Sequence, residues 1–335
     1  MPTRIARFVI MATCALPLAA HAWGHKGHQV VGAIADRQLN KAAAQHVREL
    51  LGMPLRDAAG WADCVKDVTM VGGIPEYKPM QQYAAACRIF ETKSGIADMK
   101  DFVARNTGNC TTNAGAEVCH KQYHYTDVNI TQPAYAELVG TSKNDIVHAI
   151  AAAIDVLQGR PSPAPFSIKS QREALFLLTH LVGDVHQPLH AAAIYLDQQG
   201  RPIDPDALDP FDHQTETRGG NSLTLGSSNL HSYWDTIPEG LSPDQLPASM
   251  LQEATQTPQA DGPLTTCSTA WATDTIRQAG AAYDNVRFGP RGDKGKWVAT
   301  LTDRGSYDTR KQALQRGQLA KAGGRLAQLL NEIWQ

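Results

Sequence analysis

The stretch LTHLVGDVHQPLH (residues 178–190) places polar, chemically versatile side chains inside a strongly apolar segment. His180 and Asp184 are four residues apart, so on a helix both side chains leave the same face one turn apart. A carboxylate among leucines and valines is costly to bury unless it is paired or bound to a cation. Pro188 ends the expected helix, and His190 follows in a turn that can bend back toward the pair. This stretch predicts a buried helix that carries metal ligands.

Helical periodicity recurs on both sides of this segment. Apolar residues at helical spacing predict helices after Trp23, up to Gly52, over 146–157 with a cap at Ser142 or Asn144, over 168–185 and near 307–334. Only 193–196 and 221–225 resemble strands, which would form a small hairpin. With no repeat and no inter-domain linker, the sequence predicts a mainly α, single-domain helical bundle.

The first residues have the features of an export leader. Arg4 and Arg7 precede an apolar run over 8–20 that is too short to span a bilayer, and Ala20-His21-Ala22 is an A-x-A cleavage signal. We therefore expect a signal peptide over 1–22, cleavage between Ala22 and Trp23, and a mature domain over 23–335. The protein would then be periplasmic or secreted.

The charge balance limits the partners. The leader removes two arginines and no acidic residue, so the formal charge moves from −2 to −4. No later stretch is long and apolar enough to be a membrane helix. A chain with this charge does not bind polyanions through lysine and arginine alone. If it handles nucleic acid, another source of positive charge is required.

Five cysteines remain after removal of the leader, in keeping with export. Cys110 and Cys119 enclose a short loop and are the first disulfide expected. Cys64 with Cys87 is a plausible second, which leaves Cys267 without a partner, although spacing alone does not determine connectivity. The absence of a C-x-x-C pair argues against a thiolate zinc site.

Further histidines and aspartates repeat the pattern of the opening stretch. His231 and Asp235 are again four residues apart, Asp63 lies in GWADC, and His124 and Asp127 lie in QYHYTD. Cleavage before Trp23 would also create an amino group five residues before His28. Imidazole and carboxylate without thiolate suit zinc. These potential ligands are too many for one ion.

In this order the motifs resemble those of the S1/P1 nuclease family, which are trinuclear-zinc, single-strand-specific nucleases. The motifs that carry the resemblance are Trp23-Gly24-x-x-x-His28, Trp61-Ala62-Asp63, His124-Tyr125-x-Asp127, His180-x-x-x-Asp184-x-x-x-x-x-His190, Gly219-Gly220-Asn221 and His231-x-x-x-Asp235. Beyond Asp235 only a helical tail is similar. The resemblance implies the helical bundle shared by zinc phospholipases C and single-strand nucleases.

The resemblance also implies the ligands of three zinc ions per chain. One set would be Asp63, His124, His180 and Asp184. A second would be the amino and carbonyl groups of Trp23 with His28 and Asp184, so that Asp184 bridges two ions. The third would be His190, His231 and Asp235.

The implied reaction is hydrolysis of single-stranded DNA and RNA to 5′-nucleotides, with activity on 3′-mononucleotides. A hydroxide bridging two zinc ions would attack phosphorus, and the third zinc would stabilise the leaving 3′ oxygen. Asp63 would orient or deprotonate the water, and Lys66 would neutralise phosphoryl oxygens where the family commonly has arginine. An unstacked base would lie on Tyr125, its edge bonded by Asp127 and Asn221. No stable protein partner is implied, so we expect a monomer.

Two alternatives are considered. A zinc phospholipase C shares the helical fold, an amino-terminal Trp and three zinc ions, but that family spaces its Trp and first His further apart and commonly ends its ligand set with glutamate, where this chain has Asp235. A zinc-storage protein would favour loose His-rich tracts over ligands placed singly on helices.

Among the other histidines, His186 is expected to point away from the metals. A surface position is predicted for His46, His120, His148 and His213.

Overall fold

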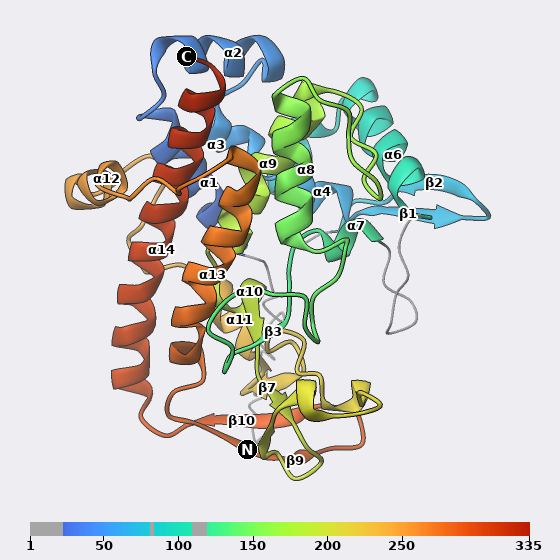
Figure 1. The fold of residues 1–335 in the computed structure, drawn as a ribbon, viewed down its shortest axis with the longest axis vertical. Coiled ribbons are helices and arrows are strands. Elements are labelled where there is room, and N and C mark those ends of the chain that lie inside the picture. The colour runs from blue at the N-terminus through green and yellow to red at the C-terminus, as the bar shows by residue number, and fades with distance from the viewer. Residues whose placement is uncertain (1–22, 81–83, 109–118) are drawn as a thin grey trace, which may run out of the picture.

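The computed structural model describes residues 23–80, 84–108 and 119–335, and most of its elements are helices (Figure 1). The predicted leader over 1–22 lies outside the described residues. The helices are α1 (Gly24–Asp36), α2 (Lys41–Leu51), α3 (Leu55–Ala58), α4 (Trp61–Val65), α5 (Ala84–Cys87), α6 (Lys93–Asn106), α7 (Cys119–Gln122), α8 (Ile146–Leu157), α9 (Gln171–Val185), α10 (Pro188–Ala191), α11 (Leu230–Asp235), α12 (Ala248–Thr255), α13 (Cys267–Ala279) and α14 (Arg304–Ile333). The predicted mainly helical class is confirmed.

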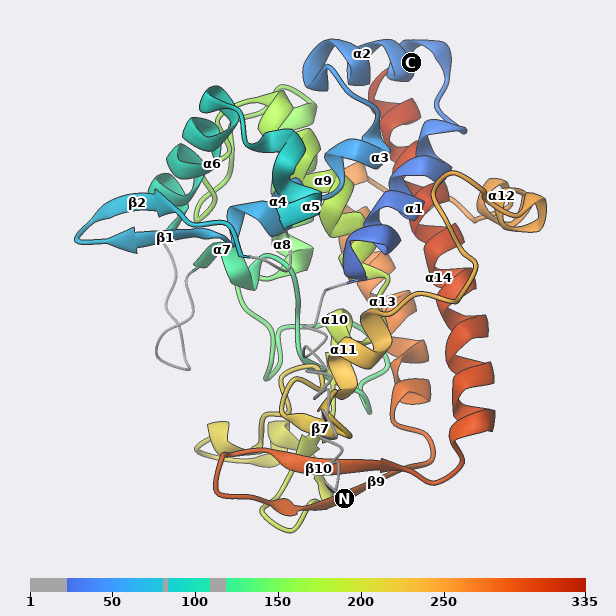
Figure 2. The same ribbon diagram turned by 180° about the vertical axis from the view of Figure 1, so that it is seen from behind.

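Helix α9 is the centre of the bundle. Every residue from Glu173 to Val185 is buried, because α8, α4, α1 and α14 all pack against this helix. Figures 1 and 2 show α9 between α8 on one side and α1 and α14 on the other. Ser170 caps its start by accepting a hydrogen bond from Glu173 N at 3.2 Å. An all-round apolar helix is expected at such a position.

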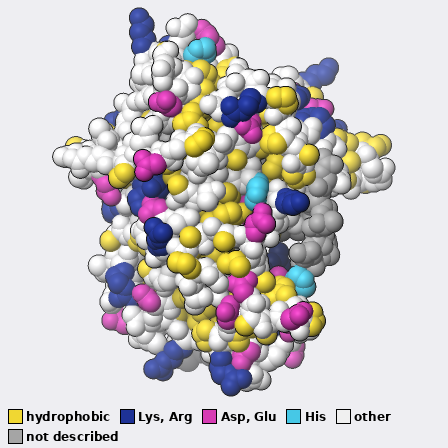
Figure 3. All heavy atoms as spheres, viewed as in Figure 1, with side chains coloured by type: hydrophobic (Ala, Val, Ile, Leu, Met, Phe, Trp, Pro, Cys, Tyr) yellow, Lys and Arg dark blue, Asp and Glu magenta, His cyan; other side chains and the backbone are white. Residues whose placement is uncertain are grey.

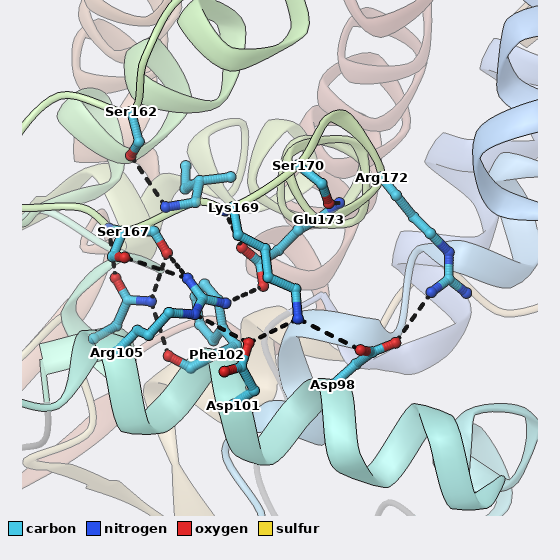
Figure 4. Close-up of polar contacts among 12 residues, drawn as sticks. Asp98, Asp101, Phe102, Arg105, Ser162, Ser167, Lys169, Ser170, Arg172 and Glu173 are labelled. Atoms are coloured by element: carbon cyan, nitrogen blue, oxygen red, sulfur yellow. Dashed lines mark hydrogen bonds and ion pairs between the residues drawn. The ribbon is translucent and has the colours of Figure 1, made fainter.

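Ion pairs fasten the start of α9 to helix α6, as Figure 4 shows. Arg105 Nη2 lies 2.6 Å from Glu173 Oε1, and Lys169 Nζ lies 2.7 Å from Asp101 Oδ2. The buried Glu173 carboxylate is thus paired with a guanidinium, as a charge out of water requires. The exposed pairs in this group contribute much less to stability.

Two helix ends illustrate what local sequence does and does not predict. Helix α2 ends as expected, with Gly52 in the left-handed region at φ 69°. The predicted caps of α8, Ser142 or Asn144, are wrong. Asp145 caps the helix, and its Oδ1 accepts from Val147 N at 3.1 Å and His148 N at 3.2 Å. Ser142, Asn144 and Asp145 are all residue types that cap helices, and in the structure Asp145 accepts from the first N–H groups of α8.

Among the described residues the strands form four small sheets, and the four-stranded one lies at one end of the molecule (Figures 1 and 2). The strands are β1 (Val68–Val71), β2 (Ile74–Tyr77), β3 (Val128–Asn129), β4 (Ala192–Ala193), β5 (Tyr195–Leu196), β6 (Pro202–Ile203), β7 (Leu223–Leu225), β8 (Ser228–Asn229), β9 (Val286–Arg291) and β10 (Trp297–Leu301). The larger sheet has the order β8-β7-β10-β9.

The predicted pairing between 193–196 and 221–225 is wrong. Strand β5 pairs with β6, and β7 pairs with β8 and, in parallel, with β10. The partner β10 comes far later in the chain, so local patterning does not reveal it. The hairpin of β1 and β2 carried a readable signal, because its turn is Gly72-Gly73 with φ of 57° and 82°.

The cysteines follow the predicted pattern where they are described. Cys64 and Cys87 form a disulfide that joins α4 to α5, with an S–S distance of 2.04 Å. Cys267 is buried and not disulfide-bonded. The predicted bridge from Cys110 to Cys119 involves a residue outside the described ranges. In the part of the chain that the structure describes, no helix is both long and apolar enough to cross a membrane.

We expect Asp145→Ala to lower the free energy of unfolding by about 2–3 kcal/mol, because it removes the α8 cap and the hydrogen bond from Tyr135 Oη at 2.7 Å. Urea unfolding monitored by circular dichroism measures this change. Asn144→Ala is the matched control and should cost less, because Asn144 Oδ1 accepts no hydrogen bond. A larger loss in Asn144→Ala would contradict the assignment of the cap.

Candidate metal centre

The predicted ligands come from widely separated parts of the chain, and the structure brings their side chains together. Helix α1 supplies His28, α4 supplies Asp63, and the segment before β3 supplies His124. Helices α9, α10 and α11 supply the others. The side chains form three buried groups that could each hold a metal ion: His28, Asp63 and His180; His124, His180 and Asp184; His190, His231 and Asp235.

The two carboxylate oxygens of Asp184 face different histidines. Oδ2 lies 2.9 Å from His124 Nδ1 and 3.1 Å from His180 Nε2. Oδ1 lies 3.2 Å from His28 Nε2. Burial opposes ionisation of Asp184, but the surrounding imidazoles outweigh it and hold the pKa of this carboxyl well below its usual range. A carboxylate that turns one oxygen to each of two donor sets has the geometry of a bridging ligand.

Asp63 lies beside the Asp184 histidines and beside a lysine. Its Oδ1 is 3.7 Å from His180 Nε2 and 2.8 Å from Lys66 Nζ. Burial raises the pKa of Asp63, but Lys66 and the neighbouring histidines lower it further, so the net shift is downward. Lys66 follows the last residue of α4, within reach of both the carboxylate and the surface.

The third group is built at the end of α11. His231 Nε2 lies 3.6 Å from Asp235 Oδ2, and the rings of His231 and His190 have centroids 4.7 Å apart. Gln187 Nε2 donates to Asp235 Oδ1 at 2.8 Å. Burial nevertheless raises the pKa of Asp235 well above its usual range, so a nearby cation is needed to keep this carboxyl ionised.

Backbone carbonyls orient three of the imidazoles. The Nδ1 atoms of His180, His190 and His231 lie 2.7, 2.8 and 2.7 Å from the carbonyl oxygens of Ala59, His124 and Gly219. An Nδ1–H that donates to a carbonyl leaves the lone pair on Nε2, which is the tautomer that binds a metal. Each Nε2 therefore points into its group as an acceptor.

Several buried polar atoms in these groups make no hydrogen bond among the described residues: His28 Nε2, Asp184 Oδ1, His190 Nε2 and Asp235 Oδ2. Such atoms are rare in native proteins, and each one needs an explanation. Here they converge on the predicted ligand sets, and their nitrogen and carboxylate donors suit zinc. The buried His/Asp groups are therefore compatible with the metals that the sequence predicts.

The start of α1 is fixed against α9. The buried Trp23 indole donates through Nε1 to Gly183 O at 2.8 Å, the carbonyl directly before Asp184. The His28 ring stacks on His180 with centroids 3.7 Å apart. A Cβ at Gly183 would lie 2.8 Å from His28 Nδ1, so only glycine permits this approach. Trp23 therefore lies near the predicted bridging carboxylate.

The three residues predicted to hold the base are half-buried and lie beside the third group. Thr126 N, between Tyr125 and Asp127, donates to His190 O at 2.8 Å. A Cβ at Gly219 would lie 3.4 Å from Asp127 Oδ1 and 2.2 Å from Leu189 O. Asn221 Nδ2 donates to Arg218 O at 3.1 Å. The loops around 125–127 and 219–221 thus adjoin each other and the predicted metal ligands.

The histidines predicted to lie outside the ligand sets are found either buried away from the ligands or at the surface. His186 is buried but, as predicted, points away from the ligands, with Nδ1 donating to Val182 O at 2.7 Å. His46 is exposed, and His148 and His213 are partly exposed beside Asp145 and Glu216. The predicted surface position of His120 is wrong. It is 2% exposed on α7, because tertiary packing covers a helix too short to show a periodic pattern.

Gln187 is the site residue that the sequence reasoning missed. It is fully buried between Asp184 and His190, and a buried amide in a ligand-bearing segment is the signal that could have identified it. Besides bonding Asp235, its Oε1 accepts from Leu189 N at 2.5 Å and so caps α10.

The fold and the site define a helical protein built around adjoining buried His/Asp groups that could hold metal ions. A family model described as S1/P1 Nuclease matches residues 23–335. Endonuclease 2 of Arabidopsis thaliana is 25% identical over 343 residues, which cover 94% of this chain and 91% of that protein. The chain belongs to the S1/P1 nuclease family and is a hydrolase that acts on phosphodiester bonds.

We expect His120→Phe to reduce the acid sensitivity of folding. Burial lowers the pKa of His120 to about 3, from about 6.5 when unfolded, so its contribution to stability is full above pH 6.5 and is lost as the pH falls toward 3. The wild type should lose up to about 3 kcal/mol more than the variant between pH 7 and 4. Urea unfolding in a chelator measures this, and the two proteins should respond alike between pH 7 and 8. Equal losses down to pH 4 would refute the buried, neutral state.

Proposed function

We propose that this chain is a three-zinc nuclease that hydrolyses single-stranded DNA and RNA to 5′-nucleotides and also acts on 3′-mononucleotides. The observation that carries the proposal is the division of the Asp184 oxygens between two sets of histidines, with a third His/Asp group adjoining them. Family membership supports a phosphodiester substrate, and the donor chemistry supports zinc.

The ligand sets in this proposal are those that the family resemblance implies. The third set coincides with a group described above, whereas His28, which lies there with Asp63 and His180, is assigned with Asp184. Asp63, His124, His180 and Asp184 would hold one ion, and His190, His231 and Asp235 another. The remaining ion would take His28, Asp184 and the amino and carbonyl groups of Trp23. Removal of residues 1–22 would then create a ligand, because an amide nitrogen is a poor zinc donor. The bond from the Trp23 indole to Gly183 supports this role by tying the new terminus to α9.

Bound zinc would supply an activated water, Lewis acidity at the phosphoryl group and positive charge in the cleft. Asp63, whose pKa is depressed, stays ionised. It is better suited to accept a hydrogen bond from the water and orient it than to act as a strong base. Lys66 is held 2.8 Å from Asp63 and would add positive charge beside the phosphoryl oxygens. On the face in Figure 3, acidic and basic side chains of the described residues are interspersed, so charge from a metal centre matters more.

Selectivity for single strands would follow from depth. His28, His180 and Asp184 are each 0% exposed, so a phosphate in the rigid backbone of a stacked duplex would not reach them. A flexible strand can place one base on Tyr125 and offer its edge to Asp127 and Asn221. We also propose that the protein is exported through the leader over 1–22 and acts as a monomer.

The first test is hydrolysis of single-stranded DNA, RNA and phosphatidylcholine by the mature protein, with zinc and with a chelator. We expect zinc-dependent release of 5′-nucleotides and intact lipid. Asp184→Asn should lower activity at least about 100-fold and retain fewer zinc ions, because it removes the bridging charge. Asp36→Asn, which alters a carboxylate that caps α3, is the control. Unchanged zinc content in Asp184→Asn would exclude the bridging role, and lipid cleavage with intact nucleic acid would favour a phospholipase.

Tyr125→Ala should raise KM about tenfold and change kcat less, because stacking of a base on an aromatic ring is worth about 1–3 kcal/mol. Tyr125→Phe keeps the ring and should keep the wild-type KM. Initial rates on single-stranded DNA over a range of concentrations measure both constants. An unchanged KM in Tyr125→Ala would mean that this ring does not hold a base.

A further inference from the structure

Helix α14 carries a row of buried polar side chains in positions where an apolar stripe would be expected. We call Lys311, Gln315, Gln318 and Arg325 the α14 polar stripe. Successive members are four, three and seven residues apart, so they share one face of the helix. Gln315 and Gln318 are 0% and 1% exposed. Buried amides of this kind need partners, and their partners include carbonyls at the ends of α11 and α9.

The first half of the stripe holds the end of α11. Gln315 Nε2 donates to Trp234 O at 2.6 Å and to Thr236 O at 3.0 Å, and Lys311 Nζ donates to Thr236 O at 3.0 Å. Asp235 lies between these two carbonyls in the chain. The last carbonyls of a helix have no partner within it, so α14 supplies the missing donors. The backbone is therefore fixed to α14 on both sides of Asp235.

The second half of the stripe holds the end of α9. Gln318 Nε2 donates to His186 O at 2.8 Å. Arg325 Nη1 donates to His186 Nε2 at 2.9 Å, and Arg325 Nη2 pairs with Asp274 Oδ2 at 3.0 Å. His186 lies between Asp184 and His190 in the chain. The non-ligand histidine thus links the ligand-bearing segment to α14.

We propose that the α14 polar stripe positions the third metal site by holding the ends of α9 and α11 at a fixed separation on one rigid helix. The bond from Gln187 to Asp235 joins the same two segments directly, and the stripe sets the distance at which that bond forms. This inference rests on the proposed function. Residues that orient metal ligands typically change metal affinity about 10- to 100-fold when they are replaced.

The test compares Gln315→Met with Gln328→Met. Gln328 lies on the same helix and donates to Thr257 O at 2.6 Å, a carbonyl outside the metal-binding segments. Each mature protein is loaded with zinc, dialysed against graded chelator and analysed for bound metal. Thermal unfolding of the metal-free proteins is measured in parallel. Gln318→Met, which releases the other helix end, is included because Gln315→Met alone could fail to fold.

We expect Gln315→Met and Gln318→Met to lose one of three zinc ions at chelator concentrations about 10- to 100-fold lower than the wild type does. Gln328→Met should match the wild type in zinc retention even where its metal-free Tm falls equally. Wild-type zinc retention in both stripe variants would overturn the inference and leave the proposed function intact. A wild-type protein that binds no third ion would instead overturn the proposed function, and this inference with it.

Discussion

The structure depends on one carboxylate, Asp184, that is ionised and entirely removed from water near the C-terminal end of α9. Such a charge is prohibitively costly in an apolar core unless other groups compensate it. Helix α1, the segment before β3 and α9 itself each bring an imidazole to its oxygens. These imidazoles compensate the charge in part, and divalent cations would add to that compensation. The packing of the bundle is arranged around that requirement.

The site is correspondingly built where regular structure ends. The carbonyls that orient His180, His190 and His231 belong to Ala59, His124 and Gly219, all outside helices, where a carbonyl is not consumed by an intrahelical bond. Close approach then requires the smallest residue. At Gly219, φ is 54° and a side chain would meet Leu189 O. The Gly-Gly-Asn segment therefore constrains the third His/Asp group as much as the proposed base site.

The sequence predicts the parts of this arrangement that follow from local spacing. His180 with Asp184 and His231 with Asp235 share helix faces, and apolar periodicity places the long helices. It does not predict the burial of His120 or the pairing of β7 with β10, because each depends on segments distant in the chain. Nor does it select Asp145 over Ser142 or Asn144 as the cap of α8, because all three side chains can cap a helix. Gln187 and the α14 polar stripe were also not predicted, because their hydrogen-bond partners lie far away in the chain. A glutamine in a sequence does not by itself indicate which group it will bond. The clustering of the candidate ligands was predictable, but the groups that hold their helices in place were not.

The ligands and the groups that support them differ in this way because of the lengths of the helices that carry them. Helices α10 and α11, which carry the third group, have only 4 and 6 residues, and isolated helices shorter than about 12 residues are marginal in water. Contacts with other segments of the chain must therefore fix the geometry of these two helices. Helix α14 has 30 residues, packs along α1, and bonds the ends of both α9 and α11. The tail that lacks ligand motifs thus gives the short ligand-bearing helices the rigidity that their own sequences do not provide.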